Sequence, residues 1–377
     1  MSTLTLADPT PATREVAPPA RAAWPWAALA VLLPALALAL HVGQRRGGDV
    51  TATYHIGHEF ADRTGLTLYY DVFHLEDEPY DGQFFLALAN DPLLLSFYDP
   101  TRFYRGRRIA WAWAGALLGL GRPGWIVYAL PLATLLLLGA AVWVLARLLI
   151  EHGRHPAWAL LHAASLGVAV CLLRQLADAF AVNLLILGAF AWHRQRRGGA
   201  ALLFLLACLA KETSILVPAA LAAERLWRRR PREAAPLLLI PAGMALWWAW
   251  VLRSSNGLYV GPENLGPPLG GVLDSLRRPL PGYRAGETLS FWTMIGIVAL
   301  APLARPTDGW RWAVLAFTGL AVVSTRKIWE EFWSYGRVHM TLPAFLLLLY
   351  ALRGRKLDLA APVAAAAAGL WIWLLAS

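Results

Sequence analysis

Charged side chains are scarce in this chain of 377 residues, because Asp, Glu, Lys and Arg together make up 15% of it. A soluble domain usually carries about 25% charged residues. Hydrophobic residues account for 58% of the sequence. This shortage of charge argues against a water-soluble domain, and it indicates that lipid is the main solvent of the chain.

Cysteine is nearly absent too. The two cysteines, Cys171 and Cys208, both lie inside apolar stretches. A disulfide framework or a cysteine-based metal site would need more cysteines at close spacing. Glycine-rich phosphate loops, zinc-protease helix motifs and nucleophile elbows are also missing. The sequence therefore argues against a disulfide scaffold, a zinc module and nucleotide-driven transport.

The net charge of +10 does not indicate nucleic-acid binding, because the charges flank apolar segments instead of forming a continuous basic patch. Short basic clusters occur at 194–197, 225–232 and 353–356. Such clusters mark cytoplasmic loops of membrane proteins. This distribution predicts a cytoplasmic N-terminus and a multi-pass topology in the cell (inner) membrane.

Many apolar segments approach the roughly 20 residues that are needed to cross a bilayer. They are residues 22–41, 125–148, 157–173, 176–192, 200–210, 214–224, 236–252, 289–304, 311–325, 338–352 and 359–376. We therefore predict an all-α integral membrane protein with about eleven transmembrane helices. A disordered cytoplasmic tail, 1–21, would precede a single polytopic domain, 22–377. The shorter apolar stretch 109–121 is predicted to be an interfacial helix.

Lys211 and Glu212 interrupt the apolar run 200–224, which allows two interpretations. One ordinary span would place a Lys-Glu pair at mid-membrane, at a cost of about 2.5–3.5 kcal/mol for each charge. Two short helices meeting at Lys211, Glu212 and Thr213 would instead keep the basic clusters on both sides in the cytoplasm. We predict two short helices.

Two outer loops are long, 42–108 and 253–288, and long loops often carry function. The first contains ten acidic residues. Its most distinctive run is Tyr80-Asp81-Gly82-Gln83, in which glycine allows close approach of the backbone. Asp81 is therefore a candidate general base or metal ligand. The alternative is a solvated acidic loop with an interfacial turn.

Basic residues follow that loop at Arg102, Arg105, Arg107 and Arg108. Arginine forks match phosphate oxygens two at a time. These side chains are expected at headgroup depth, where they either anchor the protein to membrane lipids or recognise one lipid-linked phosphate.

Further polar residues interrupt apolar runs at positions that the predicted topology brings to the outer face. They are Arg174 with Asp178, Lys211 with Glu212, and Tyr335 with Arg337. Ionisable residues at membrane depth usually mark a functional cavity. We predict one shared site, while structural ion pairs, such as Arg174 with Asp178 at i,i+4, are the alternative.

Histidines offer only a weak metal signal. His55 and His58 form a His-x-x-His pair with His74 nearby. No companion ligand is fixed in position, so the sequence leaves a divalent metal ion open as a cofactor.

Two short motifs resemble a known family, the GT-C superfamily of membrane glycosyltransferases. The LAKET run at 209–213 resembles the lysine-containing tip between two short helices in its protein-mannosyltransferase and aminoarabinose-transferase-like branch. The RQLAD run at 174–178 resembles that branch's Arg…Asp turn. The single span followed by a long acidic outer loop is similar as well. The resemblance covers about residues 20–230.

The resemblance implies a GT-C-like helical fold whose active-site cavity opens on the periplasmic or extracellular face. It implies a polyprenyl-phosphate sugar donor, with Asp81 as the catalytic residue and a glycan, lipid or protein as the acceptor. The implied phosphate-binding residues are Arg108, Arg174, Lys211 and Arg337, and the supporting residues are Tyr80, Gln83, Asp178, Glu212 and Tyr335. The chain departs from the family in lacking an Asp-Glu or Asp-x-Asp pair directly after the first span, which leaves the metal requirement open.

Two other functions remain open from the sequence. A transporter or flippase for a lipid-linked saccharide would also need cations to bind phosphate. The polar residues favour one side of the membrane, and no internal repeat is visible, which favours surface chemistry over translocation. A non-catalytic scaffold on the same fold is the third interpretation.

Overall fold

The computed structural model describes residues 20–70, 74–95, 102–254, 264–277, 285–303 and 308–376. Within these ranges the chain is almost entirely helical, which confirms the predicted all-α class. The only sheet there consists of two short parallel strands, β1 (Ile56–Gly57) and β2 (Leu75–Glu76). The predicted tail lies outside the described residues as far as residue 19, and the predicted loop 253–288 is described only in part.

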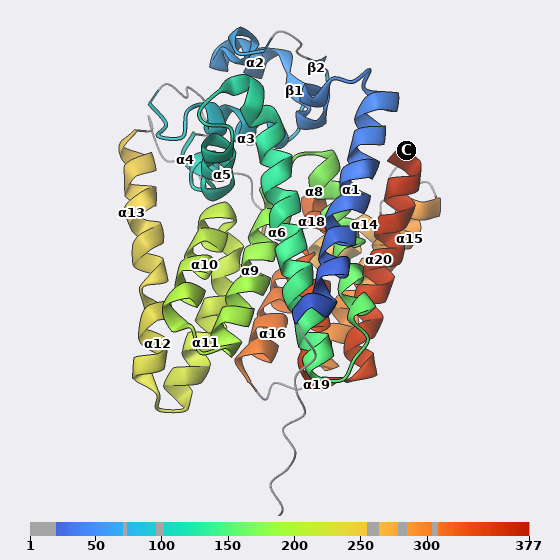
Figure 1. Ribbon diagram of the computed structural model, residues 1–377. Coiled ribbons are helices and arrows are strands. Elements are labelled where there is room, and N and C mark those ends of the chain that lie inside the picture. The colour runs from blue at the N-terminus through green and yellow to red at the C-terminus, as the bar shows by residue number, and fades with distance from the viewer. Residues whose placement is uncertain are drawn as a thin grey trace, which may run out of the picture.

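Long helices run roughly side by side and form the body of the molecule (Figure 1). The first half of this bundle contains α1 (Trp24–Arg45), α6 (Pro123–Glu151), α7 (Leu160–Ala163), α8 (Leu166–Leu173), α9 (Ala177–His193), α10 (Arg197–Ala210), α11 (Leu216–Trp227), α12 (Pro231–Leu238) and α13 (Ile240–Arg253). The second half contains α14 (Gly270–Arg277), α15 (Ala285–Leu300), α16 (Gly309–Val322), α17 (Arg326–Trp329), α18 (Phe332–Val338), α19 (Thr341–Arg353) and α20 (Lys356–Ala376).

The segment between α1 and α6 covers one end of the bundle, at the top of Figure 1. We call residues 46–122 the loop segment. Its helices are α2 (His58–Thr64), α3 (Gly82–Asn90), α4 (Arg102–Gly106) and α5 (Ala110–Leu118). The short helix predicted at 109–121 is therefore confirmed as α5.

Five helices, among the described residues, are long and apolar enough to cross a membrane, and a sixth span results if the bent pair α7–α8 is counted as one. The five are Trp24–Arg45, Pro123–Glu151, Pro231–Arg253, Phe332–Arg353 and Lys356–Leu374. The eleven predicted spans are not confirmed, because helices such as α9 and α10 are shorter than the roughly 20 residues of a full crossing.

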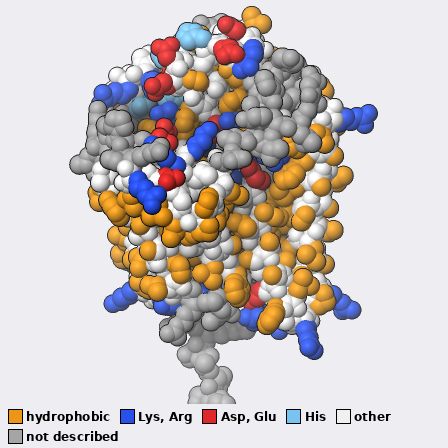
Figure 2. Space-filling model, turned by 180° about the vertical axis from the view of Figure 1, so that it is seen from behind, with side chains coloured by type: hydrophobic (Ala, Val, Ile, Leu, Met, Phe, Trp, Pro, Cys, Tyr) orange, Lys and Arg blue, Asp and Glu red, His pale blue; other side chains and the backbone are white. Residues whose placement is uncertain are grey.

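The surface of the bundle carries a belt of hydrophobic side chains, with charged side chains toward its two ends (Figure 2). Trp24, Leu32, Leu246 and Leu374 are among the large apolar side chains exposed on its helices. Soluble monomers rarely expose apolar surface on this scale. The belt is the surface expected of a helical membrane protein.

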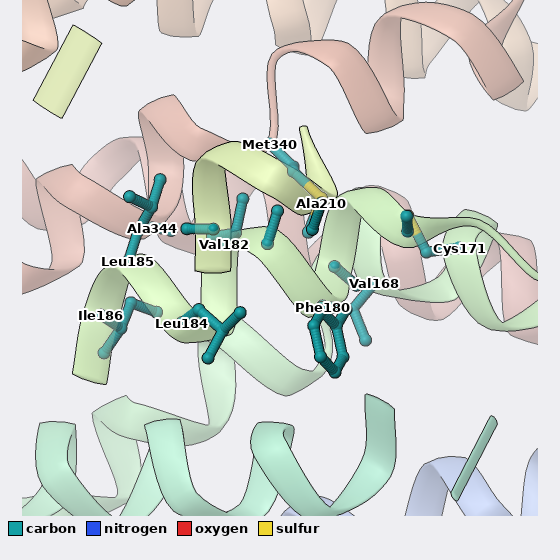
Figure 3. Packing of buried hydrophobic residues seen from close by; sticks show 14 of the residues in the cluster. Val168, Cys171, Phe180, Val182, Leu184, Leu185, Ile186, Ala210, Met340 and Ala344 are labelled. Atoms are coloured by element: carbon teal, nitrogen blue, oxygen red, sulfur yellow. The ribbon is translucent and has the colours of Figure 1, made fainter. Parts of the chain in front are cut away.

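The core of buried side chains extends through α1, α6, α10 and α20, and one part of it lies around α8, α9 and α19. Val168 on α8, Phe180 and Leu185 on α9, and Ala344 on α19 are all buried there (Figure 3). These helices are mostly apolar, as buried helices are. The buried Asn183 in the middle of α9 is an exception, and its side chain hydrogen-bonds to α7 at 2.8 Å.

Helix boundaries follow local sequence signals. Pro123 begins α6 at a position where its missing N–H costs nothing. Gly354 ends α19 with a φ of 73°, a conformation that glycine adopts readily. α10 ends at Lys211, whose backbone is extended at φ −154°, and α11 begins after one short 3₁₀ turn, Glu212–Ile215. The prediction of two short helices is confirmed.

Hydrogen bonds from aromatic side chains fix the loop segment to the bundle. The Tyr54 hydroxyl donates to the carbonyl oxygen of Val127 at 2.7 Å, and Trp111 Nε1 donates to that of Leu130 at 3.1 Å. Trp247 Nε1 on α13 donates to the carbonyl oxygen of Gly106 at 2.8 Å. The loop segment is therefore held at the end of the bundle from two sides.

Gly82 marks the closest approach of the loop segment to the bundle. A Cβ atom there would lie 2.6 Å from the carbonyl oxygen of Arg174 and 2.8 Å from that of Tyr54. Backbone atoms cannot rotate away as a side chain can. We therefore expect Gly82→Ala to lower the free energy of unfolding by about 1–3 kcal/mol through overpacking.

The measurement is the thermal unfolding midpoint of the purified protein in detergent. Gly124→Ala is the matched control, because Gly124 also lies in the first turn of a helix but a Cβ there meets nothing within 4 Å. Equal midpoints for the two variants would contradict the close approach at Gly82.

Candidate functional site

A cavity of about 1150 Å³ opens where the loop segment meets the ends of α9, α10, α16 and α18. We call it the charged cavity. In the described part of the chain, six cationic and five acidic residues line it, which is far more charge than a membrane bundle normally carries. They are Arg105, Arg107, Arg108, Lys211, Lys327 and Arg337, with Asp81, Asp178, Glu212, Glu330 and Glu331.

Five of these residues form a continuous chain of ion pairs. Asp81 is held from two sides, by Arg105 at 2.7 Å and by Arg337 at 2.8 Å. Arg337 also lies 3.8 Å from Asp178, which in turn pairs with Lys211. The chain thus joins α3 and α4 of the loop segment to α18, α9 and the end of α10.

A second, separate pair lies beside this chain. Arg108 donates from Nε and Nη2 to the two carboxylate oxygens of Glu212, at 2.7 and 2.6 Å. Arg108 also donates to the Tyr104 hydroxyl at 3.2 Å. This two-pronged geometry is the strongest form of an arginine–carboxylate contact. It fixes the tip between α10 and α11 against the loop segment.

Local sequence explains how Asp81 and Lys211 reach the cavity. Asp81 immediately precedes α3, and the close packing of Gly82 brings it to the turn after α8. Lys211 leaves the helical conformation at the end of α10, and it is only 7% exposed. A buried ammonium group requires a partner, and Asp178 in the first turn of α9 supplies it.

The protonation of Asp81 is set by two opposed effects. Burial by itself would raise the pKa of Asp81, but the guanidinium groups of Arg337 and Arg105 reverse this and hold the pKa well below its usual value of 3.8. Asp81 is therefore a carboxylate at every physiological pH.

The structure brings together seven of the residues singled out from the sequence. Tyr80, Asp81, Arg108, Asp178, Lys211, Glu212 and Arg337 all line the charged cavity. They come from five separate stretches of sequence. Their common position around one cavity is what a shared site requires, whereas the membrane face on which the cavity opens and the chemical roles of the residues stay predictions.

Three singled-out residues do not line the cavity. The guanidinium of Arg174 stacks on Tyr80 and on Trp333, at 4.8 and 4.2 Å from the ring centroids. Gln83 is buried and accepts a hydrogen bond from the Gly57 N–H at 3.1 Å. These side chains support the wall of the cavity from behind.

Tyr335 is the third. It is fully buried, and its hydroxyl donates to the carbonyl oxygen of Glu287 at 3.2 Å.

Arg174 and Asp178 make no pair with each other, so the i,i+4 alternative is wrong. The reason is that α8 ends at Arg174 and α9 begins at Ala177, so the two residues do not share one helix face.

Sequence reasoning did not assign Arg105, Arg107 and Lys327 to the site. The run of arginines after the loop identified the region, but no spacing shows which guanidinium meets Asp81 and which meets Glu212. Arg107 and Lys327 make no ion pair within the described part of the chain. The other four cations of the cavity each pair with a carboxylate.

A second cavity, of about 440 Å³, adjoins the first. We call it the apolar cavity. It lies among α11, α13 and α16, and its lining includes Leu216, Met244 and Trp248. The two cavities share Glu212, Thr213 and Leu320. The polar space therefore lies directly beside an apolar space between helices.

His55, His58 and His74 do not form a metal site among the described residues. His55 Nδ1 hydrogen-bonds to Glu76, which also accepts from Arg46 at 2.7 Å. No group of three His, Cys, Asp or Glu side chains is arranged there to hold a metal ion. The Glu76 carboxylate instead ties the end of α1 to the loop segment.

The Lys211–Asp178 pair provides a test of the ion-pair chain. Lys211→Met should lower the free energy of unfolding by about 3–5 kcal/mol, because it leaves Asp178 buried with only the longer contact to Arg337. The double variant Lys211→Met, Asp178→Asn should lose less, since no charge is orphaned. Chemical denaturation in detergent measures both. A double variant that is less stable than the single one would contradict the pairing.

The low pKa of Asp81 predicts how stability depends on pH. Because the pKa is depressed in the folded state, the stabilisation by Asp81 is complete above the unfolded value of 3.8 and is lost as the pH falls further. The difference in unfolding midpoint between wild type and Asp81→Asn should therefore be constant from about pH 7 to about pH 5 and should shrink below that. A difference that changes near neutral pH would contradict the assignment.

Comparison with known proteins does not assign this site to a family. No protein family, no curated protein and no solved structure matches the chain. The function is therefore argued from the two cavities and their side chains.

Proposed function

We propose that this protein is a membrane glycosyltransferase. It moves a sugar from a polyprenyl-phosphate donor to an acceptor hydroxyl on the non-cytoplasmic face, with inversion of the anomeric centre. The proposal includes a GT-C-like arrangement of about eleven membrane passes, in which short helices such as α10 and α11 end at the cavity.

One observation carries the proposal, namely that the charged cavity and the apolar cavity lie side by side and share Glu212, Thr213 and Leu320 in their walls. A sugar phosphate on a polyprenyl chain has the same two parts, a polar head and an apolar tail. The charged cavity, at about 1150 Å³, is slightly larger than the usual range for small-molecule sites, so it has room for a donor sugar and an acceptor together.

The charge of the cavity supports a donor with a single phosphate. Among the residues that the structure describes, six cationic and five acidic ones line the cavity, an excess of one positive charge. A sugar phosphodiester carries one negative charge, which this excess balances. A diphosphate donor would leave one negative charge uncompensated in a partly desolvated site, which is unfavourable.

Asp81 would accept the proton of the acceptor hydroxyl. The hydroxyl oxygen attacks the anomeric carbon, the bond from that carbon to the phosphate oxygen breaks, and its electron pair remains on the phosphate. The attacking oxygen becomes strongly acidic as its new bond forms, so a carboxylate with a low pKa is a sufficient base. Arg105 and Arg337 fix the direction of that carboxylate.

The cations of the cavity would stabilise the departing phosphate, whose negative charge grows as the bond breaks. Arg108, Lys211 and Arg337 are each already paired with a carboxylate. Their fixed positions mean that little reorganisation is needed when charge develops. Arg174 would act indirectly, by holding the Tyr80 ring.

Asp81→Asn should lower the rate of sugar transfer by about 10²–10⁴-fold, the range for loss of a general base. The assay uses purified protein in lipid with radiolabelled polyprenyl-phosphate sugars and a panel of hydroxyl acceptors. Asp77→Asn is the matched control, because Asp77 lies in the same loop segment with its side chain fully exposed. It should leave the rate unchanged.

Full activity of a stable Asp81→Asn variant would remove the catalytic role from Asp81. Binding of the donor without any transfer would favour translocation of a lipid-linked saccharide, which also requires a phosphate-binding cavity. Chelation of divalent ions in the same assay shows whether a metal ion takes part.

A further inference from the structure

The junction between the two cavities contains polar atoms that have no partner in the described part of the structure. Arg107 Nε, Thr213 Oγ1 and Trp248 Nε1 are shielded from solvent and make no hydrogen bond there. Each such donor costs free energy when it is left unsatisfied. Unpaired buried atoms also occur elsewhere among the described residues, Trp143 Nε1 for example, but these three lie together at the junction. Three of them at one place indicate a site that is completed by something else.

Contacts show that the three residues belong to the same place. Thr213 lines both cavities, Arg107 lines the charged cavity, and Trp248 lines the apolar cavity. The Arg107 guanidinium stacks on Trp248 at 5.3 Å from the ring centroid, and on Tyr104 at 5.2 Å. The aromatic rings hold the guanidinium at the boundary without neutralising its charge.

Arg107 lacks a carboxylate partner in the described part of the chain, unlike the neighbouring arginines. Arg105 is committed to Asp81, and Arg108 makes the two-pronged contact with Glu212. Arg107 has no carboxylate within ion-pair distance among the described residues. Burial lowers the pKa of Arg107, and Glu212 only partly opposes this effect. An anion is therefore the partner that its surroundings lack.

We propose that Arg107, Thr213 and Trp248 complete the phosphate site beside the carboxylate-paired cations and bind the phosphate of a polyprenyl phosphate at the boundary between the two cavities. This inference rests on the proposed function and refines it. The phosphate of such a lipid lies where its apolar tail ends and its polar head begins. The junction is the corresponding point of the cavity, with the tail directed toward Met244 and the sugar toward Asp81.

The test measures binding of farnesyl phosphate to the full-length protein in detergent, with farnesol as the same chain without the phosphate. Arg107→Ala should weaken farnesyl phosphate binding by about 10- to 100-fold, as expected for a charge-assisted contact. Thr213→Val and Trp248→Phe each remove one donor and keep the shape, so each should weaken binding by roughly 2- to 10-fold. Arg107→Lys should restore only part of the affinity, because it keeps the charge and loses the fork.

Arg122→Ala is the matched control. The Arg122 guanidinium also stacks on a tryptophan at 5.3 Å from the ring centroid, in this case Trp125, but it lines neither cavity. Its loss should leave binding unchanged. Two competitors are tested in the same binding assay, inorganic phosphate and phosphatidylglycerol vesicles. Both should compete weakly with farnesyl phosphate.

The outcomes separate this inference from the proposed function. If Arg107→Ala, Thr213→Val and Trp248→Phe all bind farnesyl phosphate as wild type does, while wild type transfers sugar, the subsite is wrong and the proposed function stands. If wild type neither binds farnesyl phosphate in preference to farnesol nor transfers sugar, both fail. Equal competition by phosphatidylglycerol would assign the junction to bulk lipid and overturn the subsite. Should Arg107→Ala not fold, the Thr213 and Trp248 variants decide.

Discussion

The need to pair charges that are buried at the end of an apolar bundle dominates this structure. Asp81, Arg337, Asp178 and Lys211 come from four elements, and none of them is more than partly exposed. An isolated charge in such surroundings is expensive, so the packed structure requires a partner for each of them. The ion-pair chain therefore fixes the loop segment, the tip between α10 and α11, and α18 relative to one another. The charged cavity is the space that these fixed elements enclose.

The same constraint accounts for the irregular parts of the fold. α10 stops at Lys211 because the lysine must turn toward Asp178, and the following turn presents Glu212 to Arg108. Gly82 permits the close approach that brings Asp81 to the bundle. Elsewhere, α8 is apolar on all sides and needs no such irregularity. Irregular backbone is concentrated where it borders the cavity, as expected at membrane depth.

The cations of the cavity differ in whether a carboxylate pairs with them. Arg105, Arg108, Lys211 and Arg337 are matched to carboxylates, and they shape the cavity. Arg107 is held by aromatic rings instead, which stabilise a guanidinium and leave its charge available. A site built in this way stays close to neutral when empty and still presents one positive charge at the boundary of the apolar cavity. This suits a substrate with a single phosphate on a long apolar chain.

The sequence by itself determined the all-α class, the membrane-protein composition and the break at Lys211, because these follow from local hydrophobicity and from the cost of charge in an apolar run. It also singled out Asp81, Lys211 and Arg337 as polar residues out of place. Only the tertiary structure decided which charges pair. Arg174 and Asp178 are neighbours in sequence, yet one stacks on Tyr80 and the other pairs with Lys211. Partners across different helices depend on how those helices pack, and no spacing along the chain encodes that contact. For the same reason the distinct environment of Arg107, one arginine in a run of similar residues, became visible only when α13 placed Trp248 beside it.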